Sequence, residues 1–301
     1  SWAYFFTGDK TAHAAKRWAR EIASLIKSVG GGSHRLAVDK VDPFGTHGLE
    51  VEGIEIIEGQ EVAELARAIK SPDEIRAMRC AIAACEAGMA AMQAALEPGI
   101  GEQALWSHLH AENVKRGGEW IETRLLASGQ RTNPWFNECS SKIIESGEIV
   151  AFDTDLIGPY GYCADISRTW LCHGKPAPRQ QAMYQLAAEQ IAYNAALLRP
   201  GLSYLDFAEK SFPLPDAYSA NRYSVILHGV GLCDEYPAIH YAEDAKDAYD
   251  GRFEAGMTVC VESYVGEVSG PDGIKLEQQF LITATGAELL SHFPLEADFL
   301  S

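Results

Sequence analysis

Three aspartates stand out in a segment that is otherwise apolar, and their spacing could bind a metal ion. The segment from Ile149 to Asp165 reads as a β-hairpin, with an apolar strand, a Gly-Pro-Tyr-Gly turn and a returning strand. Asp153 and Asp155 are two residues apart, so on a regular strand both side chains point to the same face. Asp165 returns on the paired strand and can meet them. Because three buried carboxylates repel one another unless a cation holds them, this hairpin is predicted to be half of a metal site.

A second hairpin and one histidine complete the pattern. Glu262 and Glu277 each interrupt an apolar strand, and His228 lies between the two hairpins among small and apolar residues. Carboxylates with one imidazole suit a first-row ion such as iron, manganese, cobalt or zinc. Alone, a strand glutamate usually lies on a solvated face, and a histidine in an apolar run is usually a core residue. Their combination in two hairpins favours the metal site.

The composition limits the class of protein. The chain has 301 residues, 47% hydrophobic and 22% charged, which is typical of a globular protein with one large domain or two smaller ones. A formal net charge of -17 argues against nucleic acid as a partner. Seven scattered cysteines without a CxxC spacing favour a reducing compartment, so a cytoplasmic location is expected. No apolar run approaches the roughly 18 residues that span a bilayer, so no membrane partner is expected.

The elements that must position these residues form two regions. Residues 1–70 read as βαβ-like, too small to close a sheet, and as part of a truncated α/β N-terminal domain that the chain enters midway. Its expected elements are strands at 1–8, 35–38 and 53–57 and helices at 12–29 and 62–68.

The region 71–301 reads as an α+β domain. Helices are expected at 71–96, 101–116 and 177–198 and from 206, and strands at 121–127, 149–156, 162–171, 224–228, 258–264 and 275–282. The order helix, helix, acidic hairpin occurs twice, over 78–171 and 179–283, like a diverged internal duplication.

These motifs resemble a known superfamily. The order Asp, Asp, His, Glu, Glu, the phrase Tyr-Cys-Ala-Asp-Ile-Ser-Arg-Thr at 162–169 and the run His-Gly-Val-Gly-Leu at 228–232 are similar to those of the creatinase, aminopeptidase P and methionine aminopeptidase superfamily. The resemblance covers about residues 70–290, while 1–70 resemble the latter part of a creatinase-type N-terminal domain. It implies the pseudo-two-fold "pita-bread" catalytic domain, a metal centre that is usually binuclear, and a homodimer.

The chain departs from the peptidases of this superfamily at two histidines that bind substrate and transfer protons. Trp135, after Asn133-Pro134, stands in place of one, and Asp234 stands in place of the other. Acyl chemistry needs such donors, so a peptidase lacking both should be badly impaired. The aspartates of the first hairpin are usually eleven residues apart, but eleven before Asp165 is Thr154, between two acids.

These departures are similar to one branch, the dimethylsulfoniopropionate (DMSP) lyases of the pita-bread type. By that resemblance Asp234 would be the base, and Tyr223, five residues before His228, would line the pocket for a small zwitterionic sulfonium substrate. Iron would be the metal, with manganese, zinc, cobalt or nickel as alternatives, and the number of ions is left open. The ligands would be Asp153, Asp155, Asp165, His228, Glu262 and Glu277.

A sulfonium group can sit against aromatic faces, an attraction of roughly 0.5–2 kcal/mol per ring. Trp135 and Phe136 are expected in that pocket with Tyr223, and Trp120 in the core. Glu235 is an alternative base.

Arg168, three residues after Asp165, is expected to orient a metal ligand without binding the metal itself.

The expected activity is metal-assisted β-elimination of DMSP to dimethyl sulfide and acrylate. The main alternative is a metallopeptidase of the Xaa-Pro dipeptidase or aminopeptidase P type. A creatinase-like hydrolase without metal and an inactive relative that only binds come after it.

Overall fold

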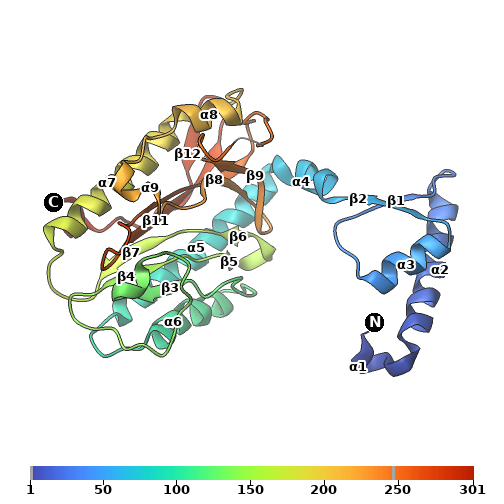
Figure 1. Ribbon diagram of the computed structural model, residues 1–301, viewed down its shortest axis with the longest axis horizontal. Helices are drawn as coiled ribbons and strands as arrows, with labels where there is room; N and C mark the ends of the chain where they lie inside the picture. Colours follow the sequence, from blue (N-terminus) through green and yellow to red (C-terminus); the bar gives the residue numbers. More distant parts are fainter. Residues whose placement is uncertain (1–2, 246–247) are drawn as a thin grey trace. The chain divides into compact units, whose positions relative to one another are not determined.

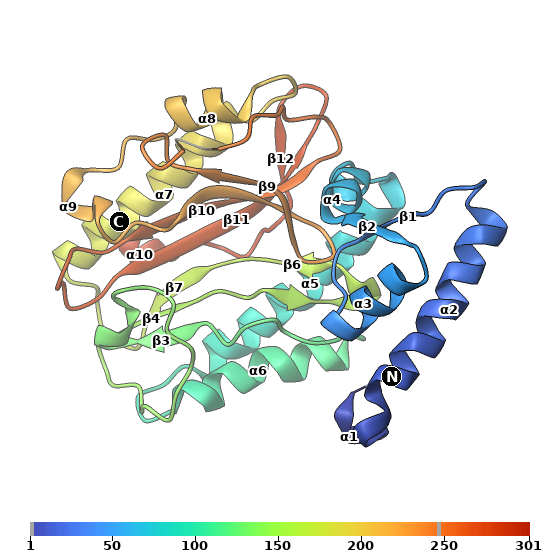
Figure 2. The ribbon, with the colours of Figure 1, turned by 45° about the vertical axis from the view of Figure 1, so that its right-hand side comes forward.

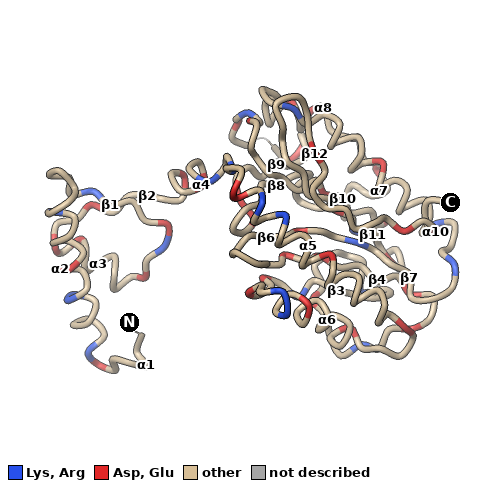
Figure 3. The backbone as a smooth tube through the Cα atoms, turned by 180° about the vertical axis from the view of Figure 1, so that it is seen from behind, with Lys and Arg blue, Asp and Glu red and all other residues tan. Residues whose placement is uncertain are grey.

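The computed structural model describes residues 3–245 and 248–301, and the chain divides into two compact units, Ser1–Arg67 and Ala68–Ser301 (Figure 1). Acidic and basic residues are distributed along helices and loops of both units rather than confined to one stretch of chain (Figure 3). No helix in the described ranges is long and apolar enough to cross a membrane.

The first unit is a small α/β arrangement. Its elements are α1 (Tyr4–Thr7), α2 (Thr11–Val29), β1 (Arg35–Val38), α3 (Pro43–Val51), β2 (Glu55–Glu58) and α4 (Gln60–Ala68). Strands β1 and β2 pair in parallel, and Ala19 and Ala23 of α2 are buried against Leu49 and Ile54. The predicted helices and the strands at 35–38 and 53–57 are confirmed within a few residues.

The predicted strand over 1–8 is wrong. Residues Tyr4–Thr7 form the short helix α1, while Ser1 and Trp2 lie outside the described residues. Phe5 is 89% exposed, so an apolar composition here does not signal a buried strand. Helical bonding is satisfied locally instead, since the Thr7 amide donates to the Ala3 carbonyl at 3.2 Å.

The second unit contains two helix-and-sheet halves, with the helices outside and the strands between them (Figure 2). The first half contains α5 (Pro72–Ala95), α6 (Glu102–Lys115) and a sheet of order β3 (Leu126–Ser128), β4 (Ile149–Phe152), β7 (Arg168–Leu171), with the separate pair β5 (Leu156–Ile157) and β6 (Cys163–Ala164). The second half contains α7 (Pro178–Leu197), α8 (Tyr204–Lys210), α9 (Asp216–Ser219) and a five-stranded sheet. Its order is β12 (Ala287–Leu289), β11 (Ile274–Ile282), β10 (Thr258–Val265), β8 (Val225–Val230), β9 (Asp234–His240), and α10 (Ala297–Leu300) ends the chain.

Each half has its own apolar core. Met78, Ile82 and Met89 of α5 are buried with Trp106 of α6 beneath the first sheet. On the other side, α7 packs against β10 and β11. This repetition agrees with the duplication expected from the order of elements.

A capping box fixes the start of α5. The Ser71 hydroxyl accepts a hydrogen bond from the Glu74 amide, and the Glu74 carboxylate accepts one from the Ser71 amide. This capping box, with Pro72 in the first turn, satisfies backbone donors that the helix leaves unpaired.

Strand register brings three of the predicted ligands together. Glu262 of β10 lies directly opposite Glu277 of β11. On the other edge of β10, Cys260 lies opposite His228 of β8. Both strands of the β10–β11 pair are largely buried, so these carboxylates project into the interior of the second unit.

Candidate metal centre and active site

All six predicted ligands converge in the second unit. Potential ligand atoms lie within 4.8 Å of one another in three overlapping groups, which share Asp165 and Glu277. The groups are Asp165, His228, Cys260 and Glu277; Asp153, Glu262 and Glu277; and Asp155, Asp165 and Asp234. The structure therefore joins the two acidic hairpins and His228 in one cluster, as the metal-site prediction requires.

The first hairpin differs from the expected regular strand. Strand β4 ends at Phe152 and β5 begins at Leu156, so Asp153 and Asp155 lie in a break, where Asp155 has a positive φ of 36°. The prediction that a regular strand points both to the same face is wrong. The break directs them to different groups of the cluster, Asp153 towards Glu277 and Asp155 towards Asp165.

Thr154 occupies the break and holds the two sides of the hairpin together. Its hydroxyl donates to the Ala164 carbonyl at 2.8 Å and accepts from the Ile166 amide at 2.9 Å. Thr154, which has the sequence spacing from Asp165 that is usual for a ligand, therefore bonds to the backbone instead. The acids on either side of it, Asp153 and Asp155, face the cluster.

His228 presents one nitrogen to the carboxylates. Its Nδ1 lies 2.9 Å from the Gly229 carbonyl, which can only accept, so Nδ1 carries the proton. Its Nε2 lies 2.9 Å from Glu262 Oε1, 3.4 Å from Glu277 Oε1 and 3.5 Å from Asp165 Oδ2. An imidazole protonated at Nδ1 directs Nε2 to the carboxylates, which is the orientation that metal-bound histidines usually have.

Two buried carboxylate oxygens without a hydrogen-bond donor in the described part of the chain also indicate that the cluster can hold a metal ion. Within the described residues, neither Glu262 Oε1 nor Glu277 Oε1 receives a hydrogen bond, although both are buried. Both oxygens face His228 Nε2, which is also an acceptor when the proton is on Nδ1. A proton or a cation is therefore needed among these three atoms. An oxygen-rich set with one imidazole suits first-row metals.

Lys275 is a member of the cluster that the sequence analysis missed. Its fully buried ammonium lies 2.7 Å from Glu262 and 3.2 Å from both Glu277 and Asp153. Ser167 assists, because its hydroxyl lies 2.7 Å from both Asp153 and Glu277. The signal was present in the sequence, since Lys275 is two residues before Glu277 and shares its face of the strand.

Burial and mutual repulsion set the protonation of the acids. Burial, and then the nearby Glu277, raise the pKa of Asp153 and of Asp165 well above the usual value. Burial also raises the pKa of Asp155 to about 7, against the hydrogen bond from the Thr123 hydroxyl. Glu277 is the exception, because Lys275 and His228 outweigh its burial and lower its pKa.

The basic groups shift in the complementary direction. Burial disfavours the charged imidazole, but Asp234 and Glu262 outweigh it and raise the pKa of His228. Cys260 remains a neutral thiol, because burial raises its pKa well above the usual value. In the protein without an ion, protons therefore occupy the positions that a cation would replace.

Asp234 and Glu235 occupy opposite environments. The Asp234 side chain is 53% exposed and lies 3.7 Å from His228 Nδ1. The Glu235 side chain is 1% exposed and pairs with Lys70 at 2.7 Å. The geometry supports Asp234, rather than the alternative Glu235, as the carboxylate that can exchange protons with a substrate.

Two of the predicted pocket aromatics lie near Lys275. Its ammonium lies 4.7 Å from the ring centre of Tyr223 and 5.9 Å from that of Trp135, which is buried. Phe136 stacks on Tyr223 with ring centres 5.4 Å apart. Trp120 is 54% exposed, so its assignment to the core is wrong.

Arg168 acts on the backbone rather than on a ligand side chain. Its buried guanidinium donates to the Glu277 carbonyl at 2.7 Å and to the Ser167 carbonyl at 2.8 Å. It thereby connects β7 to the strand that carries Glu277.

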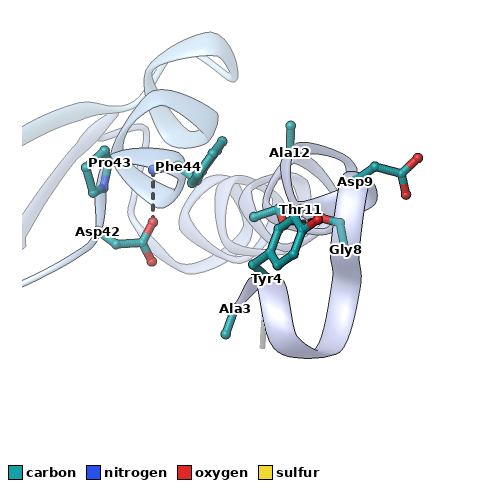
Figure 4. Close-up of a pocket in the computed structure, with 9 residues that line it drawn as sticks. All are labelled: Ala3, Tyr4, Gly8, Asp9, Thr11, Ala12, Asp42, Pro43 and Phe44. Atoms are coloured by element: carbon teal, nitrogen blue, oxygen red, sulfur yellow. Dashed lines mark hydrogen bonds between the residues drawn. The ribbon is translucent and has the colours of Figure 1, made fainter.

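The first unit contains a pocket of about 730 Å³ between its N-terminal helices and the start of α3 (Figure 4). Tyr4 and Phe44 line it, and Asp42 accepts a hydrogen bond from the Phe44 amide as the helix cap. None of the predicted site residues lines this pocket, so the chemistry is assigned to the second unit.

Two halves with their helices outside, strands inside and an acidic cluster between them define a metallopeptidase-like catalytic domain. Residues 76–284 match the family model of metallopeptidase family M24, and the chain belongs to this family. The Xaa-Pro dipeptidase of Bacillus anthracis has the same fold, with a TM-score of 0.81 and 23% identity over 92% of this chain and 77% of that one. The expected α+β pita-bread fold is confirmed.

Two relatives with higher sequence identity are named as lyases rather than peptidases. The dimethylsulfoniopropionate lyase DddP of Roseovarius nubinhibens is 50% identical over 301 residues, 97% of this chain and 67% of the relative. DddP of Roseobacter denitrificans is 46% identical over the same shares. The resemblance to the lyase branch is thereby confirmed over nearly the whole chain.

Proposed function

We propose that the protein is a DMSP lyase, which releases dimethyl sulfide and acrylate from DMSP by metal-assisted β-elimination. The observation that carries the proposal is the position of Asp234. Its half-exposed carboxylate lies beside His228, and its oxygen is within 4.8 Å of carboxylate oxygens of Asp155 and Asp165. Two DMSP lyases at 50% and 46% identity support the same substrate.

The six carboxylate and imidazole residues would hold the ion, with iron as the expected metal. When bound, the ion would polarise the substrate carboxylate and so acidify the adjacent carbon. Asp234 removes a proton from that carbon, and the electron pair of the broken C–H bond forms the double bond of acrylate. The C–S bond breaks, its electrons stay on sulfur, and neutral dimethyl sulfide leaves. The exposed Asp234 then releases its proton to solvent.

The aromatic residues would orient the other end of the substrate. The rings of Trp135 and Tyr223 already lie near one cation, Lys275, so this part of the site tolerates positive charge against ring faces. The homodimeric state, the cytoplasmic location and the identity of residues 1–70 as part of a creatinase-type N-terminal domain stay predictions from the sequence.

The test is headspace gas chromatography of the purified, metal-loaded protein with DMSP. We expect dimethyl sulfide and an equal amount of acrylate. A parallel assay offers an Xaa-Pro dipeptide, and cleavage of the peptide without release of dimethyl sulfide would assign the metallopeptidase alternative instead.

A further inference from the structure

A buried ion pair lies next to the proposed base. Lys70 Nζ is 2.7 Å from Glu235 Oε2, and the two side chains are only 2% and 1% exposed. Burying two charges is favourable only when their geometry is good and their remaining hydrogen-bonding capacity is used. Here Glu235 Oε1 also accepts from the Leu232 amide at 2.7 Å, and Lys70 Nζ lies 3.4 Å from the Ala68 carbonyl.

Glu235 ties together the turn that precedes it. This turn connects β8 to β9, and the Gly231 amide donates to the Cys233 carbonyl at 2.9 Å. The Glu235 carboxylate lies so close to Gly231 that an added Cβ there would overlap its oxygens. A single carboxylate therefore contacts the turn at Gly231 and at Leu232.

Lys70 holds that carboxylate from a part of the chain that is itself fixed. Its amide donates to the Gly256 carbonyl at 2.9 Å, and Ile69 forms a β-bridge with Met257. Strand β10, which carries Glu262, begins at the next residue, Thr258. Lys70 thus links the Asp234 turn to the strand that positions a metal ligand.

Asp234 and Glu235 are consecutive residues of β9, so their side chains leave opposite faces of the strand. We propose that Lys70 and Glu235 are positioning residues, whose ion pair fixes Glu235 inward and thereby turns Asp234 towards His228 and the cluster. This inference rests on the proposed function of Asp234 as the base. Neither Lys70 nor Glu235 touches the reacting atoms.

The expected effect is on the rate of the chemical step. Displacing a reacting group by about 1 Å can slow a reaction about 100-fold, so we expect Lys70→Met to lower kcat by about 10- to 100-fold. KM should change less than threefold or so, because the substrate contacts remain. Since the two residues act as one unit, the double variant Lys70→Met with Glu235→Gln should lose no more than the worse single variant.

The experiment compares these variants with Lys142→Met, which removes a partly buried ion pair with Glu148 of 2.5 Å elsewhere in the second unit. Each full-length variant is loaded with metal and measured for kcat, KM and metal content. Amide hydrogen exchange is measured for peptides covering 229–236. For Lys70→Met and Glu235→Gln, we expect faster exchange in this segment and an unchanged metal content. Lys142→Met should alter neither the exchange rate nor the metal content.

Full kcat in Lys70→Met, multiplied losses in the double variant, or loss of metal from either single variant would overturn the inference. If Lys70→Met does not fold, Glu235→Gln, which keeps an acceptor for the Leu232 amide, decides by the same criteria. If the unaltered protein releases no dimethyl sulfide, the proposed function fails. Hydrogen exchange then still decides whether the ion pair orders the turn.

Discussion

The ammonium of Lys275 lies 2.7 Å from the carboxylate of Glu262, with neither side chain more than 1% exposed. The acidic cluster therefore contains a buried cation of its own. Burial opposes the charged form of Lys275, but Asp153, Glu262 and Glu277 outweigh it and raise its pKa.

Replacing Lys275 with methionine should destabilise the metal-free protein. The change leaves three buried carboxylates without their fixed cation, and breaking a buried ion pair in this way costs about 3–5 kcal/mol of the free energy of unfolding. Urea denaturation after chelation measures the loss. Lys275→Arg, which keeps the charge, should recover part of it, and equal stability of all three proteins would contradict the account.

Replacing Asp234 with asparagine should abolish most of the lyase activity without releasing metal. A positioned general base typically contributes about 10²- to 10⁴-fold, so kcat should fall by at least about 100-fold. The measurement is dimethyl sulfide release, with metal analysis of the same sample. Cys233→Ser, on the same turn, is the matched control and should keep its rate within about twofold; full activity in Asp234→Asn would remove this residue from the mechanism.

Removing the metal should lower the melting temperature. Without the ion, the carboxylates of the two hairpins must retain protons or repel one another. At a free-metal concentration 100 times the dissociation constant, binding contributes about 2.7 kcal/mol. Calorimetry before and after chelation measures this shift, which returning the metal should reverse. Asp165→Asn should bind less metal, and its melting temperature should respond little to chelation.

The metal-free protein should become more stable as the pH falls from about 7 to about 4.5. Burial raises the pKa of Asp155 to about 7, whereas an unfolded aspartate titrates near 3.9, so the folded state binds more protons in this window. Stability then decreases as pH rises. The raised pKa of His228 has the same sign but acts at higher pH, since its contribution is complete below the unfolded value of about 6.5 and is lost as the pH rises above it. Calorimetry of the chelated protein at several pH values tests the sign, and Asp155→Asn should flatten the dependence.

Replacing Trp135 with leucine should weaken binding of the sulfonium end of the substrate. One lost ring contact of roughly 0.5–2 kcal/mol corresponds to an increase in KM of about 2- to 30-fold. The isostere 4-methylpentanoate, which keeps the carboxylate but has a neutral CH in place of the sulfonium, tests the cause, because its inhibition constant should change less than the KM for DMSP. Equal weakening of both compounds would indicate lost packing instead.

The predicted ligands could be found in the sequence because each is chemically out of place. A carboxylate in a strand that is otherwise apolar is a local signal, and the strand period gives its face. The register of Glu262 against Glu277 then follows from pairing two such strands. The relatives confirm the expected lyase resemblance, while the role of each site residue stays a prediction.

Two of the missed features depend on long-range contacts. Lys70 and Glu235 are 165 residues apart, and nothing near either residue predicts their ion pair. The break at Asp155 depends on Thr154 bonding to the returning strand, which a regular strand pattern does not indicate. Trp120 was assigned to the core by residue type alone, yet 54% of it is exposed.

The direct opposition of Glu262 and Glu277 has a consequence for synthesis of the protein. Like charges at opposed positions of an antiparallel pair disfavour pairing of the strands. Lys275 offsets part of this repulsion, and a bound ion would offset more. The β10–β11 hairpin lies at the centre of the largest sheet, so metal supply while the chain is being made would affect the yield of folded protein. The metal concentration of the growth medium would then affect how much of the protein folds, as well as how much of it carries the ion.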